Sequence, residues 1–307
     1  MDFTKMHGTG NDFICVNGFK EHIEHPDELA KVLCDRHFGI GADGLLLILP
    51  LNKSPLLEQA DCRMELYNAD GSRARMCGNG IRCLGKYVYE HGLVRKTSLV
   101  VETLSGIRKL ELQLRRDKIH TSSGRVEAVK VDMGSPRLNA HSIPILCERD
   151  IVIQEPVWIG DQVFSVTGVS MGNPHVVIFT DDLDIFPVSQ TGQKLEFHPR
   201  FPERMNIEFC QIVDRTHIRV RVWERGVGET LACGTGACAA VCASVLNDKT
   251  DRNVNVFLPG GELQVAWEYP TNRVYLSGKA EQVFEGKINK KDRENIKKRL
   301  TGEGEVW

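Results

Sequence analysis

The sequence predicts an α+β protein built from two pseudo-symmetric domains. Its periodic stretches are mostly strand-like, with the two-residue alternation of a half-buried strand, and only a few have helical spacing. A unit of strand, polar loop, Cys-Gly-x-Gly and helix also occurs twice, and such internal repetition indicates related domains. The 307 residues are enough for two domains that each bury a core.

The first copy of this unit begins with a strand over residues 62–67, where apolar and polar side chains alternate. A polar loop over 68–72 leads to Cys77, which opens Cys-Gly-Asn-Gly. We expect a helix directly after this motif, because apolar residues recur there at helical spacing and Gly92 is a typical stop. The helix-spaced apolar residues are Ile81, Leu84 and Val88.

The second copy follows the same plan. Residues 217–223 alternate as a strand, 224–229 form a polar loop, and Cys233 opens Cys-Gly-Thr-Gly before a helix of small residues. An aromatic residue precedes the cysteine by ten positions in both copies. A looser match joins two Gly/Asn turns, at residues 6–13 and 171–175.

Further elements complete the predicted halves, and a polar stretch over 116–126 is the predicted join between them. Residues 50–59 resemble a surface insertion. The remaining predicted strands cover 99–103, 107–114, 126–133, 175–179 and 255–258, and the remaining predicted helices cover 27–37 and about 290–300.

Composition excludes several classes of function. The net charge is −2 and no stretch concentrates Lys and Arg, so we expect no nucleic-acid partner. No apolar run approaches the roughly 20 residues that span a bilayer, so we expect no membrane contact. The first residues lack a signal-peptide pattern, which predicts a cytoplasmic protein.

Ten cysteines are present, and none forms Cys-x-x-Cys, which argues against a zinc ribbon or a thioredoxin-type pair. In a reducing compartment most should be free thiols packed as small hydrophobic side chains. The cysteines assigned to packing are Cys15, Cys34, Cys62, Cys83, Cys147, Cys210, Cys238 and Cys242.

Cys77 and Cys233 are different because each precedes a Gly-rich turn into a helix. The first N–H groups of a helix have no partner within it, so they stabilise a carboxylate and are expected to lower the pKa of a thiol placed there. Glycines in these turns leave room for a ligand to approach. Inverting an amino-acid α-carbon needs one group to remove a proton and another to deliver one from the opposite face, and a thiolate–thiol pair suits that exchange.

At these motifs the chain resembles diaminopimelate epimerases. The similarity is carried, in this order, by residues 8–13, 68–72, 76–83, 172–175 and 224–236, and it spans about residues 3 to 285. It implies domains that each wrap a mixed sheet around a central helix. It also implies a homodimer that interconverts LL- and meso-diaminopimelate for lysine and peptidoglycan synthesis, with no PLP or other cofactor and no metal.

The resemblance also assigns roles by motif. Cys77 and Cys233 are the expected acid/base thiols. The residues expected at the reacting carboxylate are Gly78, Asn79, Gly234 and Thr235. Those expected at the reacting centre and its ammonium are Asn11, His175 and Glu224. Those expected at the distal end of the substrate are Asn68, Asn173, Asn206 and Arg225, whose amides and guanidinium suit a zwitterionic group.

The resemblance further predicts that the chain returns to the first domain near its end. The expected bounds are 1–120 with about 279–290 for the first half, 121–278 for the second, and 291–307 for a charged tail. Gly44 departs from the pattern, since some family members carry a side-chain amide there, so we expect no side-chain contact from this position.

Three alternatives remain open from the sequence. A proline or hydroxyproline racemase is the nearest, although Arg225 and the asparagines favour a longer substrate with a second charged end. A thiol-based metal or redox protein would use Cys233, Cys238 and Cys242, yet no second ligand pair has zinc-like spacing. A binding protein without turnover is the third.

Overall fold

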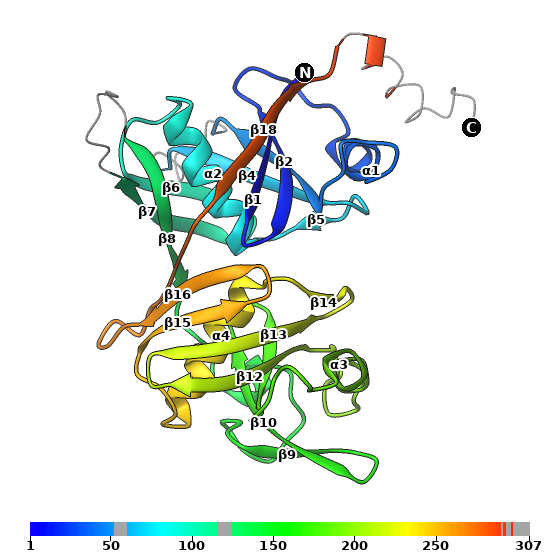
Figure 1. The fold of residues 1–307 in the computed structure, drawn as a ribbon, viewed down its shortest axis with the longest axis vertical. Helices are drawn as coiled ribbons and strands as arrows, with labels where there is room; N and C mark the ends of the chain where they lie inside the picture. The colour runs from blue at the N-terminus through cyan, green and yellow to red at the C-terminus, as the bar shows by residue number, and fades with distance from the viewer. Residues whose placement is uncertain (52–59, 116–123, 290, 293–295, 297–307) are drawn as a thin grey trace. The chain divides into compact units, whose positions relative to one another are not determined.

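The computed structural model describes residues 1–51, 60–115, 124–289, 291–292 and 296 (Figure 1). Most of the predicted helix over 290–300, most of the proposed tail, and most of the 50–59 and 116–126 stretches lie outside the described residues. Contacts divide the chain into two compact units. Unit 1 combines Met1–Lys130 with the segment that begins at Lys279, and unit 2 is Val131–Gly278.

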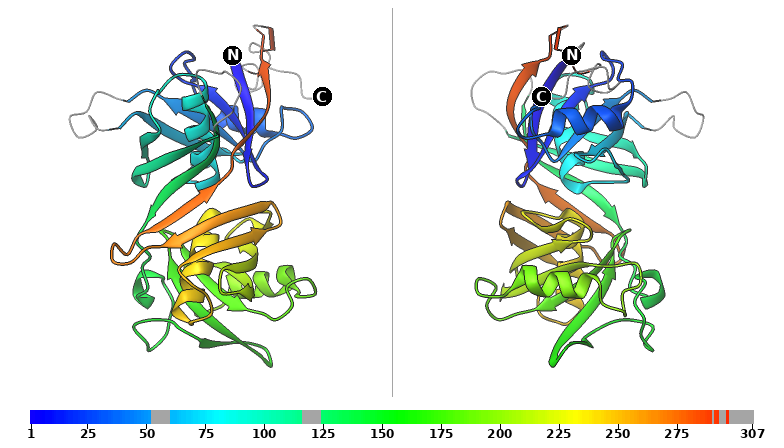
Figure 2. Two further views of the ribbon diagram at one scale, coloured as in Figure 1. Left: turned by 60° about the vertical axis from the view of Figure 1, so that its left-hand side comes forward. Right: turned by 90° about the vertical axis from the view of Figure 1, so that its right-hand side faces the viewer.

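Unit 1 is a mixed sheet with two helices in its described part. Its elements are β1 (Asp2–Gly8), β2 (Asn11–Asn17), α1 (Pro26–Cys34), β3 (Gly44–Leu49), β4 (Cys62–Asn68), β5 (Arg73–Ala74), α2 (Gly78–Glu90), β6 (Ser98–Thr103), β7 (Gly106–Arg115), the start of β8 (Arg125–Gly134) and β18 (Glu281–Lys287). The late strand β18 pairs antiparallel with β1, and the two run side by side in Figures 1 and 2.

Unit 2 is built in the same way. Its elements, after the end of β8, are the short 3₁₀ helix η2 (Ala140–Ser142), β9 (Glu155–Ile159), β10 (Gln162–Ser170), β11 (Pro174–Phe179), α3 (Val188–Glu196), β12 (Asn206–Asp214), β13 (His217–Glu224), β14 (Gly228–Thr230), α4 (Gly234–Leu246), β15 (Asn253–Leu258), β16 (Gly261–Trp267) and β17 (Val274–Gly278).

The strand pairings of the two units correspond one to one. In unit 1, β2 pairs parallel with β3, β3 antiparallel with β4, and β4 parallel with β6. In unit 2, β11 pairs parallel with β12, β12 antiparallel with β13, and β13 parallel with β15. The predicted duplication of an α+β unit is therefore confirmed, and it includes the two turns that match only loosely in sequence.

Each sheet surrounds one helix. Helix α2 contacts β1, β2, β3, β4 and β7, and every residue from Gly78 to Val88 is buried. Helix α4 contacts β10, β11, β12, β13, β15, β16 and β17, and it has small side chains where a central helix must approach strands on several sides. Both helices are thirteen residues long, and both begin directly after their cysteine, as predicted.

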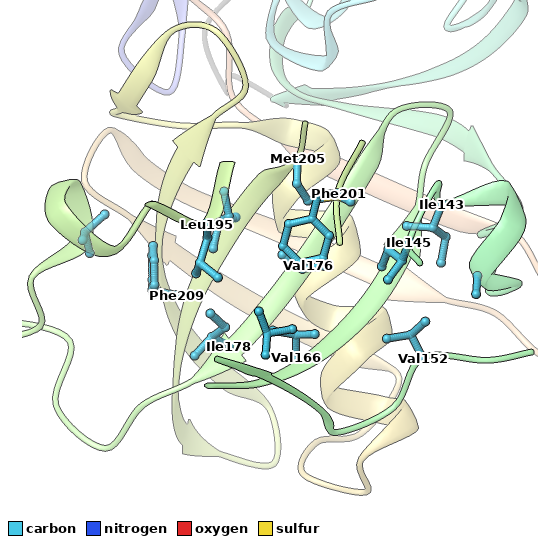
Figure 3. Close-up of a cluster of buried hydrophobic side chains, with 14 of the residues drawn as sticks. Ile143, Ile145, Val152, Val166, Val176, Ile178, Leu195, Phe201, Met205 and Phe209 are labelled. Carbon is cyan, nitrogen blue, oxygen red and sulfur yellow. The ribbon is translucent and has the colours of Figure 1, made fainter. Parts of the chain in front are cut away.

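The central strands of unit 2 are buried on both faces. Val176, Ile178 and Phe209 lie in a hydrophobic cluster that also includes Leu195 of α3 (Figure 3). Residues that alternate with them, such as Cys210, turn the other way, and the thiol of Cys210 lies 3.9 Å from the hydroxyl of Ser244 on α4. A polar side chain on this second face is therefore enclosed rather than solvated.

One helix is shorter than predicted. The helix predicted over 27–37 begins at Pro26 and ends at Cys34. Its end follows from Asp35, whose Oδ1 accepts hydrogen bonds from the backbone of His37 and Phe38 and so directs the chain into a turn. All the predicted strands are present, with ends that differ by one or two residues.

Among the residues that the structure describes, no helix is both long enough and apolar enough to cross a bilayer.

Candidate active site

Cys77 is the N-terminal cap of α2. Its backbone is extended (φ −138°, ψ 119°), and its sulfur accepts a hydrogen bond from the backbone N–H of Gly80 at 3.4 Å. The thiol also lies 3.6 Å from Asn11 Oδ1. The strand-to-helix turn thus places Sγ over the N–H groups of the first helical turn, where negative charge is stabilised.

Asn11 and Asn79 are brought together beside Cys77. Asn79 Nδ2 donates to Asn11 Oδ1 at 3.4 Å, and Asn11 Nδ2 donates to the carboxylate of Asp43 at 2.7 Å. Because a carboxylate accepts only, the amide nitrogen of Asn11 must face Asp43, which leaves its oxygen facing the thiol. Asp43 is itself bonded to Arg36 at 2.8 Å.

Arg82 is a site residue that the sequence did not single out. Its side chain is fully buried under the first turn of α2, where it donates to Asn79 Oδ1 at 3.0 Å and to Thr9 Oγ1 at 2.6 Å. It also donates to the backbone oxygens of Gly78 and Lys279, at 2.9 and 3.3 Å. A guanidinium at this place fixes the amide of Asn79 and adds positive charge near the helix end.

Asn68 lies apart from this group. It ends β4, is exposed, and donates to Ser72 Oγ at 2.9 Å within its own turn. Gly44 lies opposite it on β3. A Cβ atom on Gly44 would come within 2.8 Å of the Tyr67 carbonyl oxygen, so the backbone as it stands leaves no room for a side chain there.

Cys233 caps α4 in the same conformation as Cys77 (φ −122°, ψ 117°). Its sulfur accepts from Gly236 N at 3.4 Å and lies 3.4 Å from Thr235 Oγ1. Glu224, at the end of β13, accepts from Thr230 Oγ1 at 2.6 Å, and its carboxyl group is a further hydrogen-bonding neighbour of the thiol.

The expected lowering of the thiol pKa is wrong for Cys233. Burial raises its pKa well above the usual 9.0, and the negative charges of Glu224 and Glu208 raise it further, while the donors Thr235 and Gly236 oppose this only in part. Burial also raises the pKa of Glu224. Removing water from the sulfur therefore outweighs the helix end, and at rest Cys233 carries its proton.

His175, Asn173 and Thr235 form a connected group on the α4 side of the sheet. His175 Nε2 lies 3.0 Å from Asn173 Oδ1, and Asn173 Nδ2 donates to Thr235 Oγ1 at 3.2 Å. The other ring nitrogen of His175 lies 2.7 Å from Glu208 Oε1, with both side chains fully buried. Sequence reasoning missed Glu208, because alternation between Ile207 and Phe209 would place it toward solvent.

Asn206 and Arg225 meet through the backbone. Asn206 Nδ2 donates to the Pro174 carbonyl at 2.7 Å, and its Oδ1 accepts from Arg225 N at 3.0 Å. The guanidinium of Arg225 donates to the Glu203 carbonyl at 3.0 Å and is exposed. The structure therefore gives Asn206 a role in shaping this loop and leaves Arg225 accessible to a ligand.

The loop after β13 has a second support that was not predicted. Glu196, the last residue of α3, is buried, and it accepts from Trp223 Nε1 at 2.8 Å and from Gly226 N at 2.9 Å. Because Glu224 and Arg225 lie between these two contacts, Glu196 fixes the stretch that carries both.

The other cysteines are buried, with one exception. Cys147 is partly exposed, and its thiol lies 3.2 Å from the Arg149 carbonyl. Across the described residues, no three His, Cys, Asp or Glu side chains gather in a group that could hold a metal ion.

Both units thus present the same device, which is a thiol over a helix N-terminus with hydrogen-bonding side chains around it. Such a device can bind a carboxylate through N–H groups and exchange a proton at sulfur. The surroundings differ, since Cys77 has amides and a buried guanidinium nearby and Cys233 has two carboxyl groups and an imidazole.

Comparisons with known proteins show which family the chain belongs to. The family model described as diaminopimelate epimerase matches residues 3–139 and 167–283. A diaminopimelate epimerase of Acetivibrio thermocellus is 51% identical over 289 residues, which are 94% of this chain and 99% of that protein. The Methanococcus maripaludis enzyme of the same name is 46% identical over 289 residues, covering 94% of this chain and all of that protein.

Solved structures share the fold at low identity. A hydroxyproline epimerase from Agrobacterium vitis matches with a TM-score of 0.67 and 14% identity, over 93% of this chain and 91% of that one. A phenazine biosynthesis protein of the PhzF family from Bacillus anthracis matches with a TM-score of 0.67 and 16% identity, over 94% and 99%. On the family model and the close relatives, this chain belongs to the diaminopimelate epimerase family.

Proposed function

We propose that this isomerase interconverts LL- and meso-diaminopimelate by proton transfer between the α-carbon of the substrate and two thiols, those of Cys77 and Cys233. One sulfur, as thiolate, removes the α-proton, and the other, as thiol, delivers a proton to the opposite face. After one turnover the two have exchanged protonation states, so the reverse reaction needs no other group. The reaction uses no cofactor in this scheme.

The helix ends supply the charge stabilisation. Removing the α-proton spreads negative charge onto the reacting carboxylate, and this charge must be met by donors already in place. The N–H groups at Gly78 and Asn79 in one unit and Gly234 and Thr235 in the other are such donors.

The polar residues around each thiol are assigned to the other charged groups of the substrate. Asn11 Oδ1, fixed by Asp43, and Glu224 offer acceptors for the ammonium of the reacting centre. Arg225, held by its backbone bond to Asn206, offers a fork for the distal carboxylate. Asn68 and Asn173 are assigned to the same distal end, and His175 to the reacting centre.

The observation that carries this proposal is the matched capping geometry of the two cysteines, each with a glycine N–H bonded to its sulfur at 3.4 Å. The deciding experiment follows the α-hydrogen of LL-diaminopimelate in deuterated water. A two-thiol mechanism incorporates solvent deuterium into the newly formed meso product, whereas a product without deuterium would rule it out.

Variants identify the groups responsible. Cys77→Ser and Cys233→Ser should each lower kcat by at least about a thousandfold, because a hydroxyl of much higher pKa cannot act as the base near neutral pH. Cys147→Ser is the matched control, since this thiol is partly exposed and lies outside both capping turns. Full activity in either capping variant would refute the assignment, and proline should remain unconverted by the native protein.

Two associated expectations remain predictions. A homodimer is expected from the family and is checked by light scattering of the purified protein. A cytoplasmic location is checked by fractionation of cells that express the native chain.

A further inference from the structure

We infer that Glu208 is a positioning residue for the thiolate form of Cys233, acting through a directed chain of hydrogen bonds that runs from Glu208 through His175, Asn173 and Thr235 to the sulfur. This inference rests on the proposed acid/base role of Cys233. It adds a residue and a direction that the capping geometry alone does not contain.

The chain is continuous in the structure. The successive contacts are 2.7 Å from Glu208 Oε1 to His175 Nδ1, 3.0 Å from His175 Nε2 to Asn173 Oδ1, 3.2 Å from Asn173 Nδ2 to Thr235 Oγ1, and 3.4 Å from Thr235 Oγ1 to Cys233 Sγ. All five residues lie in unit 2.

The direction of each hydrogen bond follows from the chemistry of the groups. Asn173 presents its oxygen to His175, so Nε2 of His175 must carry a hydrogen. The amide nitrogen of Asn173 donates to Thr235, which leaves the hydroxyl hydrogen of Thr235 available to Cys233, and the thiolate form of that sulfur can only accept it. Every donor therefore points toward the sulfur, and each bond strengthens the next.

Glu208 fixes the start of the chain. With a hydrogen on Nε2, the Nδ1···Oε1 contact is either an imidazolium beside a carboxylate or a neutral imidazole beside a carboxylic acid, so the pair is neutral overall. The other oxygen, Glu208 Oε2, has no hydrogen-bond partner in the described part of the chain. The carboxyl group is thus committed to His175.

Gly236 indicates that this carboxyl group belongs to the helix end. A Cβ atom on Gly236 would come within 2.6 Å of Glu208 Oε1, so a side chain at this position would have to displace the carboxyl group from the first turn of α4. The second glycine of the Cys-Gly-Thr-Gly motif therefore makes room for Glu208 here, in addition to any role toward a ligand.

The described strands of unit 1 contain no equivalent of this hydrogen-bond chain. The strand pairing that sets His175 beside Asn206 sets Phe13 beside Gly44, so Phe13 takes the place of His175. The same register puts Leu46 in the place of Glu208. The arrangement therefore serves one thiol of the two.

By its charge alone Glu208 raises the pKa of Cys233, but the Glu208–His175 pair is neutral overall, so the hydrogen-bond chain acts at the sulfur through the Thr235 donor, which opposes the groups that disfavour a thiolate there. The ionisable groups around this sulfur are Glu224 on β13, Glu208 on β12 and His175 on β11. Replacing Glu208 with Gln leaves the pair neutral, and the imidazole then has a single hydrogen that is no longer confined to Nε2, because a Gln amide can accept from Nδ1 as well as donate to it. In the tautomer with the hydrogen on Nδ1, Asn173 and Thr235 reverse, and the sulfur loses one donor.

The test measures thiolate at Cys233 without turnover. In a Cys77→Ser background, the rate of iodoacetamide alkylation of Cys233 at pH 8 is followed by mass spectrometry of the peptide. Glu208→Gln should slow alkylation about tenfold, because a hydrogen bond to a charged group shifts a pKa by about one unit. Thr235→Val, which cuts the chain at its other end without touching the buried carboxyl group, should slow it to a similar degree.

A double variant tests whether Glu208 and Thr235 act on Cys233 through the same hydrogen-bond chain. If one chain links the two ends, Glu208→Gln adds no further slowing in the Thr235→Val background. Full additivity, or an unchanged rate in Glu208→Gln despite a lower melting temperature, would overturn the inference and leave Glu208 a structural residue. In the reciprocal Cys233→Ser background, Glu208→Gln should leave alkylation of Cys77 unchanged, and an equal slowing there would also overturn it.

A kinetic readout separates the two proposals. In the native background, the pH at which kcat/KM reaches half its maximum on the acid side should move up by about one unit in Glu208→Gln. If native protein fails to exchange the α-hydrogen but the alkylation shift is present, the proposed function fails and the chain stands. If both cysteines are required for turnover but Glu208→Gln changes neither the alkylation rate nor the pH profile of kcat/KM, the proposed function stands and the proposed role of the hydrogen-bond chain fails.

Discussion

Gly44 and Asn206 occupy equivalent positions in the two units. Gly44 begins β3 opposite Phe13 of β2, and Asn206 begins β12 opposite His175 of β11, with both pairs of strands parallel. The Asn206 amide joins the Pro174 carbonyl to the Arg225 N–H in unit 2, whereas at Gly44 in unit 1 neighbouring atoms, the Tyr67 carbonyl oxygen nearest, occupy the space that a side chain would need. The duplicated framework thus carries different side chains in its two halves.

Replacing Asn206 should affect both stability and substrate binding. Asn206→Ala leaves the Pro174 carbonyl and the Arg225 N–H without their partner, which costs about 2 kcal/mol in the free energy of unfolding. KM for diaminopimelate should rise more than kcat falls, because Arg225 loses its support. Urea unfolding and steady-state kinetics check this. Asn255→Ala, which removes only a contact to His217, is the control and should leave KM unchanged.

The orientation of Asn11 gives a second prediction. Asp43→Asn removes the carboxylate that compels the Asn11 nitrogen to face away from Cys77, so the amide is free to reverse. We expect kcat to fall about tenfold, with a change of less than about 1 kcal/mol in stability since Asp43 is partly exposed. Asp184→Asn, which breaks an exposed pair with Arg219, should leave kcat intact. Equal losses in both variants would show a general effect of charge.

The repeated motif explains how far the sequence alone could go. The spacing of Cys77 and Cys233 from their preceding strands identified both capping turns and both central helices, because local pattern and glycine placement determine them. The strand β18 was expected to return to unit 1 only through the family resemblance, since its pairing with β1 is a contact between opposite ends of the chain that no local pattern encodes.

The supporting residues could not be predicted for a physical reason. Glu208 and Arg82 are charged residues within amphipathic patterns, and such residues ordinarily face solvent. Each is buried instead, because the helix and the strands of its unit close over both faces of the pattern. The lowered pKa expected for a helix-capping thiol failed at Cys233 for the same reason, since enclosure removes water and collects carboxyl groups around the sulfur.

Replacing Glu196 should weaken the support of the loop that carries Glu224 and Arg225. Glu196→Gln supplies only one oxygen for the two donors, Trp223 Nε1 and Gly226 N, so one of them loses its acceptor inside the protein. The free energy of unfolding should fall by about 1–3 kcal/mol, and KM should rise severalfold. Glu155→Gln, which weakens a pair with Arg200, is the control for stability without a change in KM. An unchanged KM in Glu196→Gln would mean that the loop needs no such support.

The buried thiols outside the site predict a loss of stability in alkali. Burial raises the pKa of Cys62 and of Cys210 to about 12, from an ordinary value of 9.0. The unfolded chain therefore releases these protons first, so their contribution is intact below about pH 8.5 and is lost progressively as the pH rises toward 12. At pH 10 each such thiol should cost about 1–2 kcal/mol of stability relative to pH 7.

Cys62→Ala removes one of these two thiols. The cavity that the substitution leaves lowers stability by the same amount at both pH values. The variant should therefore lose less stability than the native chain between pH 7 and pH 10. Urea titrations at the two pH values measure this difference directly. Equal losses of stability in the two proteins would show that ionisation of the Cys62 thiol does not contribute to the loss of stability in alkali.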